Sequence, residues 1–140
     1  MYYLAKKDYD YAIRICAYLA GSGSNAHYTI SELSKTLLIP KPFATKIVYQ
    51  LKQSKIVNTT RGKKGGVSLA VNPSKLSFYQ IFEAMGLVRS VSACIKDKDF
   101  CPLPAPCNIH QFFIDQEIKI IEDLMKATIN NFAFSNDSIE

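Results

Sequence analysis

Apolar residues recur three or four positions apart along residues 6–21, the spacing that places them on one face of a helix. Cys16 lies on this face and is predicted to be a small core residue. The glycine- and serine-rich stretch 21–25 ends the helix. A capping box at Thr29–Glu32 then predicts a shorter helix over 31–37. We therefore expect two helices in the first part of the chain, joined by a short loop.

A third helix is expected to begin near Pro42, because Pro40 interrupts the second helix and proline is tolerated in a first helical turn. Its inward stripe is predicted to hold apolar residues at helical spacing, namely Phe43, Ile47, Val48 and Leu51. The opposite side carries groups that bind phosphates and base edges, namely Lys41, Thr45, Lys46, Tyr49, Lys52 and Gln53. This order of helices is that of a helix-turn-helix, although a small helical bundle has the same pattern.

Two stretches, 56–60 and 67–71, follow the third helix and are predicted to pair as a hairpin, because the first is β-branched and the second alternates apolar and polar residues. Between them lies the basic, glycine-rich segment Arg61–Gly66, which is typical of a wing. Arg61, Lys63 and Lys64 supply positive charge for phosphates or for a narrow minor groove. A nucleotide-binding P-loop is excluded, because no Ser or Thr follows a Gly-Lys pair at the required spacing and a strand replaces the required helix.

A second capping box at Ser77–Gln80 predicts a helix that packs on the winged domain and ends at Gly86. The longest periodic run is 109–129, whose two apolar stripes are Ile114, Ile118, Ile121 and Met125, and Phe113, Ile120 and Leu124. This face is too wide for a lone surface helix, so we expect one stripe to pack on its own domain and the other on a second copy. A helix absorbed wholly by its own core is the alternative. Periodicity ends at Asn130, which predicts a frayed tail.

The predicted fold is mainly α with a small β-hairpin: a winged helix-turn-helix, a cysteine loop and a long C-terminal dimerisation helix. The predicted boundaries are 1–90 for the DNA-binding domain, 91–110 for the cysteine-rich sensor loop, 111–132 for the dimerisation helix and 133–140 for a flexible tail. The chain has 140 residues, of which 48% are hydrophobic, and this is enough to form a packed core.

Charge is divided unevenly along the chain. Residues 1–71 contain 11 Lys or Arg and 3 Asp or Glu, a net +8, whereas residues 72–140 contain 6 and 9, a net −3. This division favours a polyanion-binding first half, although a solvated lysine-rich surface gives the same numbers. The sequence shows no signal peptide and no run of about 18 apolar residues. We therefore expect a cytoplasmic protein without membrane contact, in which disulfides are uncommon.

Three of the four cysteines lie in the stretch 93–110. Six residues separate Cys94 from Cys101, five separate Cys101 from Cys107, and His110 follows three positions later. Prolines between the last two cysteines predict an extended loop, because proline is excluded from helix interiors. An iron–sulfur cluster, a Cys₃His zinc site and a cluster-free set of thiols are all compatible with these residues. Zinc sites usually include two cysteines separated by roughly two to four residues, and this loop has no such pair.

An enzyme is not indicated by the sequence. There is no Ser/His/Asp pattern, His27 lies in a polar loop, and the carboxylates within 109–129 have the spacing of a solvent-exposed helix face. A small iron–sulfur electron-transfer protein is the alternative of a different class. It leaves the basic wing without a purpose.

Several segments resemble the Rrf-type winged-helix transcription regulators, whose members include IscR and NsrR, over about residues 5–130. The segments that match are DYAIR at 10–14, IPKPF at 39–43 with the following Lys46-Ile47, RGKKGGVSLA at 61–70, the three-cysteine loop and the long helix. The resemblance implies a homodimer that binds a two-fold site in double-stranded DNA, with the third helix in the major groove and the wing in the adjacent minor groove. The expected DNA-contacting residues are Lys41, Thr45, Lys46 and Tyr49 on the helix and Arg61, Lys63 and Lys64 on the wing.

The same resemblance implies an iron–sulfur cluster, 2Fe-2S or 4Fe-4S, on Cys94, Cys101 and Cys107. In IscR-like members the fourth ligand is a histidine three positions after the last cysteine, and His110 matches it. In NsrR-like members it is an aspartate near the start of the first helix of the other subunit, and Asp10 matches it. A cluster with a non-cysteine ligand is labile, so purified protein can lack it. The predicted function is a transcriptional regulator that senses iron–sulfur status, redox or nitric oxide.

Overall fold

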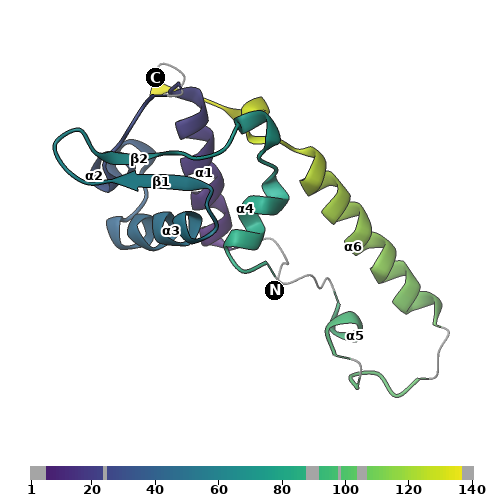
Figure 1. Ribbon diagram of the computed structural model, residues 1–140. Helices are drawn as coiled ribbons and strands as arrows, with labels where there is room; N and C mark the ends of the chain where they lie inside the picture. Colours follow the sequence, from purple (N-terminus) through teal and green to yellow (C-terminus); the bar gives the residue numbers. More distant parts are fainter. Residues whose placement is uncertain (1–5, 24, 88–91, 98, 104–106, 137–140) are drawn as a thin grey trace.

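The computed structural model describes residues 6–23, 25–87, 92–97, 99–103 and 107–136. The elements in chain order are α1 (Lys7–Gly21), α2 (Ile30–Leu37), α3 (Lys41–Gln53), β1 (Val57–Thr60), β2 (Gly66–Leu69), the 3₁₀ turn η1 (Pro73–Lys75), α4 (Phe78–Ala84), α5 (Ala93–Lys96), α6 (Asn108–Lys126) and the 3₁₀ turn η2 (Ile129–Phe132). Helices and one hairpin form a winged domain, from which α6 projects (Figure 1). The predicted fold class is confirmed.

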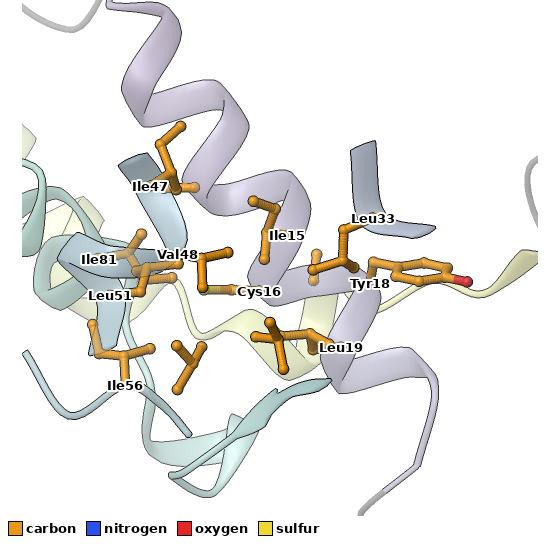
Figure 2. Close-up of a cluster of buried hydrophobic side chains, with 14 of the residues drawn as sticks. Ile15, Cys16, Tyr18, Leu19, Leu33, Ile47, Val48, Leu51, Ile56 and Ile81 are labelled. Carbon is orange, nitrogen blue, oxygen red and sulfur yellow. The ribbon is translucent and has the colours of Figure 1, made fainter. Parts of the chain in front are cut away.

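The core of the winged domain lies between α1, α2, α3 and α4, as Figure 2 shows. Ile15 and Cys16 of α1 are fully buried against side chains of the other helices, among them Leu33, Ile47 and Ile81. Cys16 is therefore a core residue, as its position on the apolar face predicted. Phe43 was expected on the inward stripe of α3, but it is 41% exposed and Ala44 is buried instead. The small alanine permits close packing at this point, and the Phe43 ring contacts that of Tyr11 edge-on, with 5.9 Å between ring centroids.

Polar contacts fix both ends of α2. The capping box predicted at Thr29 is present, with Thr29 Oγ1 accepting from the Glu32 amide and Glu32 Oε2 accepting from the Thr29 amide. At the other end, Leu38 adopts a left-handed conformation with φ 55°. The Arg14 guanidinium of α1 donates to the Leu37 carbonyl at 2.8 Å. This bond satisfies one of the carbonyls that a helix end leaves free and ties the turn to α1.

The wing is an antiparallel hairpin in which Val57 pairs with Leu69 and Thr60 with Gly66. Tyr28, which precedes α2, forms a bridge with Val67 and so adds a third short segment to the sheet. Gly66 has a φ of 153°, and a Cβ atom at this position would meet the Tyr28 backbone at 2.8 Å. The alternating stretch 67–71 forms a strand as predicted, over Gly66–Leu69, and both Val67 and Ser68 are buried in it.

The C-terminal segment packs back on the winged domain. Beyond α6 the chain becomes extended at Thr128, which bridges to Ser77, and Ile129 is fully buried. The Phe134 amide donates to the Ala17 carbonyl at 3.3 Å. The prediction of a frayed tail from Asn130 is therefore wrong for residues up to Asn136, because their packing depends on contacts with distant α1. Residues 137–140 of that predicted tail and the predicted boundary at 90–91 lie outside the described residues.

Within the described residues, no helix combines the length and the apolar character needed to cross a membrane.

Candidate functional site

The outward face of α3 carries the residues that the sequence singled out. Lys41, Thr45, Lys46 and Tyr49 are all exposed, and Tyr49 retains 61% of its accessible surface. Their helix is anchored by the buried residues Ala44, Ile47, Val48 and Leu51. Because the anchor residues alternate with the exposed ones at helical spacing, α3 is held rigidly while it presents its polar face to solvent.

The Thr45 hydroxyl already has an intrahelical partner. It donates to the Lys41 carbonyl at 2.9 Å, a common arrangement for threonine within a helix. The hydroxyl proton is thereby engaged, and the lone pairs of Oγ1 face outward. Thr45 is accordingly presented as an acceptor, which suits an amino group on adenine or cytosine.

Lys46 forms a contact that the sequence did not reveal. Its Nζ lies 3.2 Å from Oδ2 of Asp8, which belongs to the first turn of α1. The Asp8 side chain is 20% exposed and that of Lys46 56%. Asp8 lies 38 residues from Lys46 in the chain, and no local motif connects them. Only the packing of α1 against α3 brings these two charges together.

The wing tip presents its three cations to solvent. Arg61, Lys63 and Lys64 are exposed in the turn between β1 and β2. A shallow hollow separates this turn from the start of α3 and is lined by Lys41 and by the glycines of the wing. The hollow, the wing and the exposed face of α3 together form one basic surface.

The three loop cysteines are free and none of them is fully buried. Cys94 lies in α5, where its Sγ is 3.2 Å from the Ser92 hydroxyl oxygen. Cys101 is exposed, and Cys107 directly precedes α6, with His110 in that helix's first turn. The short helix α5 was not expected, and residues 104–106 of the predicted extended loop lie outside the described residues.

Cys16 differs from the loop cysteines in its chemistry. Complete burial raises the pKa of its thiol from about 9 to about 12, because a thiolate loses its hydration there. Only a thiolate is a good nucleophile or metal ligand. Cys16 is therefore a poor candidate for a nucleophile or metal ligand, which leaves the three loop cysteines as the candidate thiol ligands.

The candidate metal ligands do not meet within one chain. Asp10 is exposed on α1, beside a hollow that α1, α4 and the C-terminal segment share. Among the residues that the structure describes, no three His, Cys, Asp or Glu side chains gather closely enough to hold a metal ion. The donor types themselves, three free thiols with a histidine or carboxylate, are those that iron–sulfur clusters use.

The projecting helix α6 leaves much of its apolar surface uncovered. None of its residues is buried, although five of its apolar residues are half-buried: Phe113, Ile114, Ile120, Ile121 and Leu124. Ile118 and Met125 are 49% and 48% exposed, respectively. One side of α6 thus contacts its own chain, and the other side faces solvent.

Residues 5–134 match the Rrf2 family, described as iron-dependent transcriptional regulators. The chain belongs to this family. A candidate HTH-type transcriptional regulator of Aquifex aeolicus is 31% identical over 121 residues, which span 84% of this chain and 82% of that protein. The regulator NsrR of Bacillus subtilis is 22% identical over 131 residues, 93% of this chain and 90% of NsrR.

The solved structure of CymR, the global cysteine regulator of B. subtilis, superposes with a TM-score of 0.78 at 17% identity, covering 91% of this chain and 94% of CymR. At that identity the likeness shows a shared fold. Rrf2-family proteins are transcriptional regulators, so this chain is a DNA-binding regulator and not an enzyme. Both conclusions confirm the sequence analysis.

Proposed function

We propose that this chain is a homodimeric regulator that binds a two-fold DNA site and senses iron–sulfur status, redox or nitric oxide through its cysteine loop. The observation that carries the proposal is the position of the loop between α4 and α6 (Figure 1). It joins the winged domain to the helix whose apolar side chains stay exposed in a single chain. A change in the loop therefore acts on the element that sets the distance between two DNA-binding domains.

The exposed side of α6 supports the homodimer. Burial of exposed apolar side chains such as Ile118 and Met125 stabilises an interface by roughly 25 cal/mol for each Å² of apolar surface removed from water. Pairing two copies of α6 about a two-fold axis buries the same face on both chains. Such a dimer presents its two α3 helices to half-sites about one DNA turn, or ~34 Å, apart.

The basic surface divides into two roles in this proposal. Thr45, Lys46 and Tyr49 meet base edges in the major groove, where hydrogen-bond patterns differ between base pairs. Arg61, Lys63 and Lys64 neutralise phosphates beside or within the minor groove, which adds affinity without sequence preference. Lys41 lies between the two sets and contacts the backbone.

Cys94, Cys101 and Cys107 would hold the cluster, with His110 of the same chain or Asp10 of a second copy as fourth ligand. The fit rests on their chemistry, since all three thiols are free and none has the complete burial of Cys16. A 2Fe-2S or 4Fe-4S cluster, when bound, supplies electron exchange and reactivity toward oxygen and nitric oxide. Asp10 is exposed on α1 and is therefore accessible to another subunit.

Anaerobic purification tests the cluster and the sensing together. We expect coloured wild-type protein that contains iron and sulfide, and colourless Cys101→Ala protein that binds duplexes selected from a randomised library with a different affinity. Cys16→Ala is the matched control and should keep its colour, because Cys16 is a core residue. Equal DNA affinity of the cluster-loaded and cluster-free states would contradict the sensing role.

A cluster-free thiol regulator is the second candidate. It is favoured by the exposure of Cys101, which leaves this sulfur open to oxidants. In that case anaerobic protein contains no iron, and oxidation of the loop cysteines alone changes DNA affinity. Zinc in place of iron in the purified protein would support the Cys₃His site instead.

A further inference from the structure

The ion pair between α1 and α3 stands out on a surface that is otherwise basic. Residues 1–71 contain only three acids, and one of them, Glu32, is engaged in the capping box of α2. Asp10 is exposed on α1. Asp8 instead points at a lysine on the outward face of α3, and this is the one salt bridge among the described residues.

Stability does not account for this carboxylate. An ion pair whose lysine is as exposed as Lys46 contributes little to folding, because water and salt screen the lysine and its long side chain loses freedom. Asp8 also lies in the first turn of α1, where any acid is favoured by the helix dipole. Neither effect requires the acid to face Lys46, a residue on the surface that meets DNA.

We propose that Asp8 is a positioning residue for Lys46 that raises the sequence specificity of DNA binding at the cost of some affinity. This inference rests on the proposed assignment of α3 to the major groove. An ammonium group has three N–H donors, and the carboxylate at 3.2 Å engages one of them. The remaining two can donate to acceptors on a base edge, such as guanine O6 and N7.

The same carboxylate discourages contact between Lys46 and a phosphate. A phosphate that reached Lys46 would come close to the negative charge of Asp8, and like charges in proximity repel. A base edge carries no net charge and meets no such repulsion. Asp8 therefore weakens sequence-independent binding more than it weakens the contact with the correct base.

The test compares Asp8→Asn, Lys46→Met and the double variant with wild type, all as full-length protein. Two DNA probes are used: a mixed-sequence duplex of about 30 base pairs, roughly three helical turns, and a library of duplexes with a randomised centre. Glu83→Gln is the matched control, because it removes the same charge from an exposed position on α4 that has no part in the proposed DNA or dimer contacts.

We expect Asp8→Asn to bind the mixed-sequence duplex about threefold more tightly, the scale set by an exposed ion pair. The slope of log affinity against log salt should steepen by about one unit, since one more cation reaches the backbone. Sites selected from the library should be less sharply defined. In the Lys46→Met background, Asp8→Asn should have almost no effect, and Glu83→Gln should resemble wild type.

If Asp8→Asn raised DNA affinity equally in the wild-type and Lys46→Met backgrounds, the inference would be overturned. The gain would then come from the change in net charge and not from Lys46. Weaker binding to every duplex together with a lower Tm would also overturn it, because Asp8 would then be structural. Both results leave the proposed function intact if wild type binds duplex DNA in a salt-dependent way. A wild type that does not bind duplex DNA would overturn the proposed function and this inference together.

Discussion

The helices α1 and α6 are both amphipathic and of similar length, 15 and 19 residues, yet they differ in burial. Seven residues of α1 are buried, whereas no residue of α6 is. The core formed by α2, α3 and α4 closes over α1 within one chain. The apolar residues of α6 are covered by their own chain on one side of the helix only. A hydrophobic stripe thus predicts that a face is covered, but it does not say by which chain.

The largest expected difference is between Cys16 of α1 and the three cysteines of the loop that precedes α6. In chelator-treated protein at pH 8, Cys94, Cys101 and Cys107 should react rapidly with a thiol reagent. Cys16 should react only as fast as the core opens, because its side chain is fully buried and burial raises the pKa of its thiol to about 12. Mass spectrometry of labelled peptides over time measures the difference. Labelling of Cys16 as fast as that of the loop would show that the core opens readily.

The raised pKa of Cys16 also links stability to pH. Because the folded-state pKa lies above that of an exposed thiol, the neutral thiol contributes full stability below about pH 9. This contribution is lost as the pH rises from about 9 toward about 12. Cys16→Ala should therefore show a flatter decline of unfolding free energy over that range than wild type.

Equivalent truncations on the two helices should have different consequences. Ile15→Ala, in the fully buried part of α1, should lower the free energy of unfolding by about 3 kcal/mol through lost burial and a new cavity. Ile118→Ala on α6 should lower it by less than about 1 kcal/mol at low protein concentration but should weaken the dimer. Urea titration and analytical ultracentrifugation measure the two effects. An unchanged dimer in Ile118→Ala would place the interface elsewhere.

A smaller effect is expected where α1 supports the turn before α3. Arg14→Met should lower the free energy of unfolding by about 2 kcal/mol, because the Leu37 carbonyl loses a charged hydrogen-bond donor. Thermal unfolding measures the loss. Lys7→Met is the control on the same helix, since Lys7 is exposed, and it should leave Tm unchanged. A similar loss in both variants would mean that helix charge, rather than this hydrogen bond, is responsible.

The smallest effects separate the wing from α3 in DNA binding. Lys63→Ala should weaken binding to all duplexes alike and reduce the salt slope by about one unit, as expected for a phosphate contact. Thr45→Ala should leave that slope unchanged and alter the preferred sequence, at a cost of about 1 kcal/mol for the favoured base. Fluorescence anisotropy at several salt concentrations measures both. Identical behaviour of the two variants would contradict the division of roles.

Local sequence signals correctly predicted the starts of two helices and the position of the hairpin. The capping boxes at Thr29 and Ser77 both form, because each depends on residues three positions apart. The wing and its basic tip form where the strands and glycines predicted. The inward position of Phe43 was wrong, since periodicity does not reveal that close helix packing at this point favours the smaller Ala44.

Contacts between residues far apart in the chain account for the other differences between the predicted and the observed structure. The segment after Asn130 looks disordered by periodicity, yet the Tyr18 hydroxyl donates to Asn136 at 3.0 Å across 118 residues. Asp8 has the sequence position of an ordinary acid in a first helical turn, and only its geometry connects it with Lys46. The candidate site could therefore be predicted for its cations and thiols but not for the carboxylate that faces one of those cations.

The sequence by itself determined the helices other than α5, the basic wing, the free thiols of the loop and the family, because these depend on residues near one another or on matching segments. Tertiary structure decided which side chains surround each of them. It placed Asp8 beside Lys46, folded the C-terminal segment over α1 and left one side of α6 exposed. The physical reason is that burial and charge pairing depend on how the helices pack in space, and the spacing of residues along the chain does not reveal this packing.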